Sequence, residues 1–159
     1  MLRTLGVLGG MGPLATASFM NQVIALSPAK NDQEHIPMFI RNIPQIPDRT
    51  KFLMGLEDEN PFFELKKGFK ELTSLGVSGI VIPCNTAHYW YDALTKNADV
   101  HTISIVKSVI KQVKATGKQK VGILATTATL NMGIYQNAFK QHNIDFVEPN
   151  TQQQAAIMD

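Results

Sequence analysis

The sequence has little cysteine, little charge and no long hydrophobic run. Its 159 residues contain one cysteine, Cys84, which excludes an intrachain disulfide and a metal site built from several cysteines. Charged residues make up 18% of the chain and the net charge is only +2, without a dense block of Lys or Arg, so nothing indicates nucleic-acid binding. No apolar run approaches the roughly 18 residues of a membrane span, so no membrane partner is expected.

The remaining composition is that of a globular protein. A hydrophobic fraction of 44% argues against disorder, and the length suits one domain, or one domain and part of another. The first five residues carry one charge, Arg3, and lack the basic start and apolar stretch of a secretory signal peptide. Together with the lone cysteine, this predicts a cytoplasmic protein.

Strand patterns and helix patterns alternate along the chain. Short apolar runs predict strands over residues 4–8, 36–40, 79–82, 102–105, 120–124 and 145–147. Apolar residues at helical spacing predict helices from residue 13, over residues 61–75, 85–97, 106–117 and 129–142, and from residue 151. Their apolar stripes are expected to be core, and residues 43–49 to be a loop. The alternation predicts the α/β class, with a parallel sheet flanked by helices.

Two segments of the chain resemble each other at an offset of 116 residues (122 − 6). Residues 6–16 and 122–129 each combine a strand pattern, a turn of small residues and a helix start, and the offset pairs Phe19 with Tyr135. Every α/β chain repeats this unit, so the similarity has a plain explanation. The alternative is a duplication, which predicts two similar α/β domains, the first over residues 1–101 and an incomplete second over residues 102–159. A counterpart of Cys84 is then expected near position 200 (84 + 116).

Cys84 stands in the string Pro-Cys-Asn-Thr-Ala-His over residues 83–88, between a buried strand pattern and a helix start. Ligands bind at the carboxyl ends of strands, and the N-terminus of a helix favours a reactive thiolate. A lone cysteine is as often an inert buried residue, and both interpretations stay open. His88 lies on the same helical face and could form a Cys/His pair, although packing or capping is the favoured interpretation.

Three further segments could bind anions. Residues 9–12, Gly-Gly-Met-Gly, precede a helix start, but no acidic residue ends the second strand and no Gly-Lys-Ser/Thr follows, which argues against a nucleotide site. A tight turn without a ligand is the alternative. The string Ala-Thr-Thr-Ala-Thr over residues 125–129 could hold an anion or cap a helix. Arg49, in a proline-rich loop, could grip a carboxylate through two hydrogen bonds or be solvated.

These motifs together resemble the aspartate/glutamate racemase family, the cofactor-independent racemases of acidic amino acids. The matching strings span most of the chain in family order, namely residues 8–13, 47–49, 83–88 and 124–127. The resemblance implies two similar α/β domains with the active site in the cleft between them. It also implies a small acidic amino acid as the partner, with no cofactor and no metal.

The resemblance implies roles for the matching residues. Cys84 would be one of two thiols that exchange the substrate α-proton, one removing it from one face and the other returning a proton to the opposite face. Arg49 would bind the side-chain carboxylate. The residues implied to bind the substrate are Gly10, Met11, Arg49, Asn85, Thr86, Ala87, Thr126 and Thr127.

The sequence departs from the family in one respect. The second cysteine of the family lies in a Gly-Cys-Thr-Glu string that these 159 residues lack, in agreement with a counterpart expected near position 200. We therefore expect the chain alone to be inactive as a racemase. The alternatives are a single-thiol isomerase or decarboxylase of a dicarboxylate, and a non-catalytic relative that binds dicarboxylates. An incomplete second sheet would expose an open edge and apolar surface, which predicts a homodimer.

Overall fold

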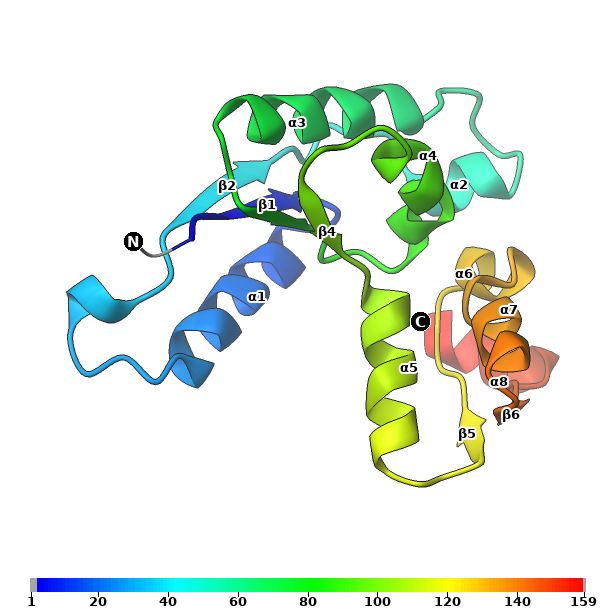
Figure 1. Ribbon diagram of the computed structural model, residues 1–159. Coiled ribbons are helices and arrows are strands. Elements are labelled where there is room, and N and C mark those ends of the chain that lie inside the picture. The colour runs from blue at the N-terminus through cyan, green and yellow to red at the C-terminus, as the bar shows by residue number, and fades with distance from the viewer. Residues whose placement is uncertain (1–2, 159) are drawn as a thin grey trace.

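The computed structural model of the protein describes residues 3–158 and contains two parallel sheets (Figure 1). The larger sheet has the strand order β2-β1-β3-β4, and the smaller one pairs β5 with β6. The strands are β1 (Leu5–Gly9), β2 (Met38–Asn42), β3 (Gly79–Val81), β4 (His101–Ile103), β5 (Lys120–Gly122) and β6 (Asp145–Val147). The prediction of an α/β fold with a parallel sheet flanked by helices is confirmed.

Helices cover both faces of the larger sheet. Figure 1 shows α1 (Pro13–Leu26) on one face and α3 (Phe62–Ser74) on the other. α5 (Ile105–Ala115) leaves the larger sheet after β4 and leads to the smaller one. The remaining helices are η1 (Asp32–Glu34), α2 (Arg49–Leu53), η2 (Thr86–Trp90), α4 (Tyr91–Thr95), α6 (Thr127–Asn131), α7 (Ile134–Gln141) and α8 (Thr151–Met158), of which η1 and η2 are 3₁₀ helices.

Two hydrophobic cores lie under these elements. Leu8, Leu65 and Ile80 belong to the first, between the larger sheet and α3, whereas Ile123 and Phe139 belong to the second, beside the smaller sheet. β4 spans the boundary expected at residue 101 and pairs with β3 in the larger sheet. The division of the chain into two domains stays a prediction.

Two predicted helices have different forms in the structure. The single helix expected over residues 129–142 is wrong, because Gly133 adopts the left-handed conformation, with φ 65°, and separates α6 from α7. The helix expected over residues 85–97 begins as the 3₁₀ helix η2 and becomes α-helical only in α4.

The loop expected over residues 43–49 ends in a short helix. Arg49 is the first residue of α2, and Asp48 is its N-cap. The Asp48 carboxylate accepts hydrogen bonds from the backbone N–H groups of Thr50 and Lys51, at 2.8 and 3.0 Å, and so satisfies donors that a helix start leaves unpaired. The cap therefore stabilises the start of α2, where Arg49 stands.

The apolar stripe of α1 is not part of a core, so the prediction is wrong for this helix. Thr16 is its one buried residue; of the stripe, Phe19 and Val23 are half-buried, whereas Met20 is 38% and Ile24 is 40% exposed. Figure 1 shows α1 slanting away from the larger sheet. The periodicity of the apolar residues identifies the helix. The apolar stripe becomes buried only where another layer of helices or strands packs against it.

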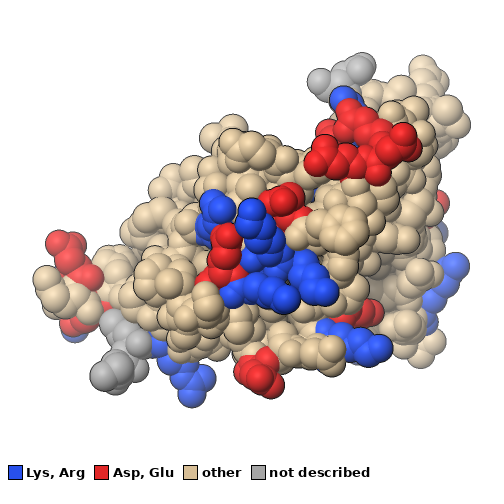
Figure 2. Space-filling view, turned by 90° about the horizontal axis from the view of Figure 1, so that it is seen from above, with Lys and Arg blue, Asp and Glu red and all other residues tan. Residues whose placement is uncertain are grey.

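Charges of opposite sign lie together over α3. Figure 2, which views the molecule from above, shows Lys and Arg side chains gathered beside Asp and Glu. On α3, Lys67 lies 4.0 Å from Glu64, and Glu71 pairs with Arg41 of β2. Within residues 3–158, no helix has both the length and the apolarity that crossing a membrane requires.

Candidate active site

Cys84 lies three residues beyond the end of β3, at the carboxyl edge of the larger sheet. Its backbone N–H donates to the carbonyl of Ile82 at 2.8 Å, which turns the chain directly after the strand. The side chain is half-buried and packs against the first core. Because β3 lies between β1 and β4, the thiol is near the middle of the edge where α/β proteins bind ligands.

His88 is bound to the backbone on both sides of its ring. Its Nε2 accepts a hydrogen bond from the N–H of Ile105 at 3.0 Å, so Nδ1 carries the proton and donates to the carbonyl of Cys84 at 2.8 Å. The ring also stacks on Tyr91, with centroids 5.4 Å apart and planes 5° from parallel. Since Ile105 begins α5, His88 caps that helix, as the favoured interpretation predicted, and neither nitrogen is left to act as a base for the thiol.

Burial lowers the pKa of His88 from its ordinary value of 6.5, and the hydrogen bond to the Cys84 carbonyl only partly offsets this. The folded chain therefore keeps His88 neutral at a pH where the unfolded chain protonates it. Below about pH 6.5 the unfolded state binds more protons, so the free energy of unfolding is expected to fall as the pH drops, and to level off below the lowered pKa. Urea denaturation between about pH 5 and 8 measures this slope.

Two variants separate the contribution of His88 from other effects. His88→Leu is expected to flatten the slope and to cost about 1–3 kcal/mol at high pH, because it leaves two partly buried backbone groups without their side-chain partner. His101→Gln changes an exposed histidine and is expected to keep the slope. A slope of unchanged size in His88→Leu would show that another group causes it.

The side chains that follow Cys84 contact residues far along the chain. Tyr135 of α7 donates its O–H to Asn85 Oδ1 at 2.5 Å. The hydroxyl oxygen of Thr86 lies 3.2 Å from that of Thr126 and 3.0 Å from that of Thr129, and the last two are 2.9 Å apart. The region around the thiol is therefore built from both parts of the chain.

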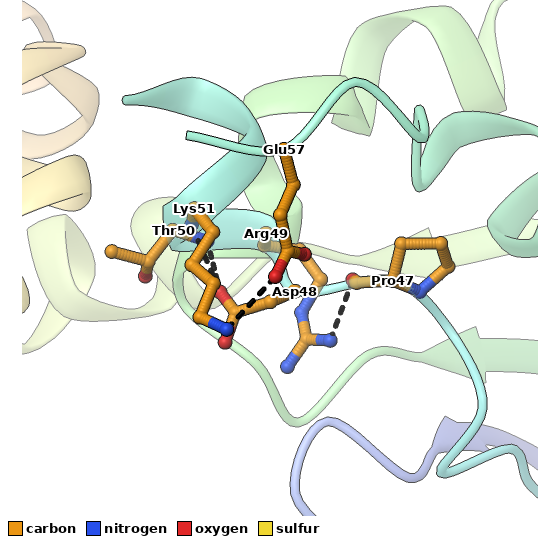
Figure 3. A network of polar contacts seen from close by, with 6 residues as sticks. All are labelled: Pro47, Asp48, Arg49, Thr50, Lys51 and Glu57. Atoms are coloured by element: carbon orange, nitrogen blue, oxygen red, sulfur yellow. Dashed lines mark hydrogen bonds and ion pairs between the residues drawn. The ribbon is translucent and has the colours of Figure 1, made fainter. Parts of the chain in front are cut away.

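The guanidinium of Arg49 is hydrogen-bonded to the backbone of the described residues through one nitrogen only. Its Nη1 donates to the carbonyls of Ile46 and Pro47, at 3.0 and 2.9 Å, while its buried Nε has no partner among the described residues. Figure 3 shows the guanidinium turned toward Pro47 and away from the ion pair of Lys51 with Glu57. α2 contacts both η2 and α6, so Arg49 begins a helix that meets the helices of Thr86 and Thr127.

Four other predicted site residues make structural contacts. The Gly10 N–H donates to Thr16 Oγ1 at 2.9 Å, and Met11 and Ala87 are buried in the first core, 7% and 0% exposed. Thr127 accepts a hydrogen bond from Gln154 of α8 at 3.2 Å and does not join the other threonines. Substrate contacts by these four residues stay a prediction.

Sequence reasoning missed Thr129 and Tyr135 as site residues. Thr129 stands in the string over residues 125–129 and is fully buried. In the sequence, Tyr135 was noted only because the offset of 116 residues pairs it with Phe19. This pairing does not indicate a polar role for its hydroxyl. It lines a cavity of about 220 Å³ together with Asn85 and Ala125. No group of three or more His, Cys, Asp or Glu side chains suited to a metal ion lies within residues 3–158.

The fold and the site describe an α/β protein in which a thiol, an amide and several hydroxyls meet at one sheet edge. A sequence model of the Asp/Glu/Hydantoin racemase family matches residues 8–159. The chain therefore belongs to this family, as its motifs predicted.

Several relatives show how far the similarity extends. The chain is 32% identical to the broad specificity amino-acid racemase RacX of Bacillus subtilis (strain 168), over 95% of this chain and 66% of that protein. The structure of Picrophilus torridus aspartate racemase matches with a TM-score of 0.87 at 31% identity, over 98% of this chain and 65% of that one. Glutamate racemase from Francisella tularensis, solved in complex with D-glutamate, shares the fold, with a TM-score of 0.67 at 22% identity over 92% and 52% of the two chains. The chain thus spans slightly less than two thirds of the first two relatives.

Proposed function

We propose that this chain carries a proton-exchanging thiol and part of the substrate site of a cofactor-independent racemase of an acidic amino acid. The observation that carries the proposal is the convergence beside Cys84, where Asn85 meets Tyr135 and Thr86 meets Thr126. These contacts join polar side chains from a distant part of the chain to the two residues that directly follow Cys84. The names of the relatives, which include aspartate and glutamate racemases, support the substrate class.

In the proposed reaction, the Cys84 thiolate removes the α-proton. An S–H bond forms, the C–H bond breaks, and its electron pair stays on the substrate as a carbanion that the α-carboxylate delocalises. Without pyridoxal phosphate no other electron sink is present, so fixed hydrogen-bond donors must stabilise the charge. We assign this role to Asn85 and Thr86, and we assign Arg49 to the side-chain carboxylate, where its guanidinium can donate two parallel hydrogen bonds.

Inversion requires a second proton donor on the opposite face of the carbanion. The 159 residues contain one cysteine. We propose that the second thiol lies outside them and that the chain alone does not racemise. The reading frame beyond codon 159 tests this, because continuation into a Gly-Cys-Thr-Glu string supports the proposal and a stop codon counts against it.

Deuterium exchange tests the reaction itself. The protein is incubated with L-aspartate or L-glutamate in D₂O, and the α-proton signal and the D-isomer are followed by NMR and chiral chromatography. A form with the second thiol is expected to lose the α-proton signal while the D-isomer accumulates. Neither exchange nor the D-isomer with either substrate would refute racemisation, and the preferred substrate identifies the specificity.

The single cysteine favours a second candidate, a one-thiol isomerase or decarboxylase of a dicarboxylate. This function predicts that the 159 residues turn over a substrate such as maleate, that Cys84→Ser abolishes turnover, and that mass spectrometry detects a covalent adduct. A clean intact mass during turnover argues against the adduct. Calorimetric heat with aspartate but no reaction would instead indicate a binding protein.

We further propose a cytoplasmic homodimer. The thiol must stay reduced to act, which suits the cytoplasm. An apolar groove of about 430 Å³ lies between Phe19 of α1, Val81 of β3 and Val109 of α5, and Met20 and Ile24 of α1 are exposed as well. Exposed apolar surface of this kind favours association. Light scattering is expected to show a dimer, and a clean monomer at micromolar concentration would contradict it.

A further inference from the structure

The hydrogen bond between Tyr135 and Asn85 joins the two hydrophobic cores. Tyr135 belongs to the second core, where its ring lies 6.1 Å from that of Phe139. Asn85 follows Cys84, which packs against the first core. Tyr135 is 9% exposed, whereas Asn85 is exposed, so a buried residue holds a side chain that would otherwise rotate in solvent. The hydrogen bond therefore links the orientation of Asn85, the residue after Cys84, to the packing of the second core.

The chemistry of the two groups sets the direction of the hydrogen bond. The Asn85 Oδ1 atom only accepts, so the Tyr135 O–H is the donor. Burial raises the pKa of Tyr135 to about 12, which keeps the phenol protonated at neutral pH. The other end of the carboxamide carries two N–H donors, and these have no hydrogen-bond partner among residues 3–158.

A carboxylate that approaches Cys84 needs donors, and a freely rotating amide presents its oxygen as readily as its NH₂. With its oxygen held by Tyr135, Asn85 must turn its NH₂ away from the phenol. The rotational entropy of the amide is then lost on folding and not on binding, which is the advantage of a preorganised site. Loss of the phenol oxygen would remove this advantage and leave the amide itself in place.

We propose that Tyr135 is a positioning residue, which holds the Asn85 amide so that its NH₂ serves as a preset hydrogen-bond donor for a carboxylate beside Cys84. The inference rests on the proposed function in one respect, the assignment of Asn85 to a substrate carboxylate. Tyr135 does not touch the reacting atoms and acts only through Asn85.

The reaction of Cys84 with two alkylating agents tests this without turnover. The thiolate sulfur attacks the methylene carbon of iodoacetate or iodoacetamide, an S–C bond forms, and iodide leaves. Iodoacetate carries a carboxylate and iodoacetamide does not, so the ratio of their rates reports carboxylate binding beside Cys84 and cancels changes in the thiol. Mass spectrometry gives both rates in the full chain.

Asn85→Ala is expected to lower this ratio about tenfold, the change that corresponds to 1.4 kcal/mol. Tyr135→Phe, which keeps the ring in the second core, is expected to lower it about three- to tenfold, with no further effect in the Asn85→Ala background. Tyr91→Phe is the matched control, because it removes a phenol hydrogen bond to the Thr102 carbonyl at 2.7 Å and is expected to leave the ratio unchanged.

Each outcome decides the inference. A parental ratio in Tyr135→Phe or in Asn85→Ala overturns it, as does an equal drop in Tyr91→Phe, which would indicate a general effect on stability. A further drop when Tyr135→Phe is added to Asn85→Ala also overturns it. Failure of the D₂O exchange experiment with the expected ratios intact would refute racemisation and leave the role of Tyr135 standing.

Discussion

In a form of the protein that carries the second thiol, replacing Cys84 by serine is expected to slow exchange of the substrate α-proton by about 10²–10⁴-fold, the contribution of a positioned acid or base. A serine hydroxyl is a far weaker acid than a thiol, so almost no alkoxide is present at neutral pH to remove the proton. NMR in D₂O measures the loss of the α-proton signal for the parent and the variant under the same conditions.

The fold should survive this substitution. Cys84 is only half-buried, and serine has nearly the same size, so thermal unfolding of Cys84→Ser is expected to stay within a few degrees of the parent. Cys84→Ala is the second variant, because it removes the polar atom altogether and is expected to be equally slow. Exchange at the parental rate in either variant would show that the thiol does not carry the proton.

Gly10→Ala is expected to lower the free energy of unfolding by about 3–6 kcal/mol. Gly10 has φ 100°, a conformation that side chains other than glycine rarely adopt, and a Cβ atom there would overlap the backbone of Ile43. That backbone cannot withdraw easily, because the Ile43 N–H donates to the carbonyl of Gly9 at 3.1 Å. Urea denaturation measures the loss, which is a large part of the 5–15 kcal/mol typical of a domain.

Gly122→Ala is the matched control for this prediction. The nearest atom to a Cβ at Gly122 is Val147 Cγ2, at 3.9 Å, so the change is expected to stay within about 1 kcal/mol. Equal stability of the two variants would contradict the steric argument. A large difference would support the tight-turn interpretation of residues 9–12, in which glycine is needed for packing whether or not a ligand binds.

Local sequence patterns predicted where helices and strands lie better than they predicted which of their residues are buried. The apolar run ending at Gly9 and the periodicity of α3 identified β1 and a core helix, because both depend on nearest neighbours in sequence. The break at Gly133 was missed, since an isolated glycine is tolerated within a helix and its left-handed conformation depends on how α6 and α7 pack. The exposure of α1 was missed because periodicity does not show whether a second layer exists.

The sequence by itself determined the α/β class, the family and the place of Cys84 at a strand end. These features follow from local periodicity, turn chemistry and short motifs. Only the tertiary structure decided that His88 binds backbone and not the thiol, that Thr129 joins Thr86, and that Tyr135 reaches Asn85. The last two contacts join residues 43 and 50 positions apart, so they form only when the two cores pack against each other, and no local pattern encodes that packing.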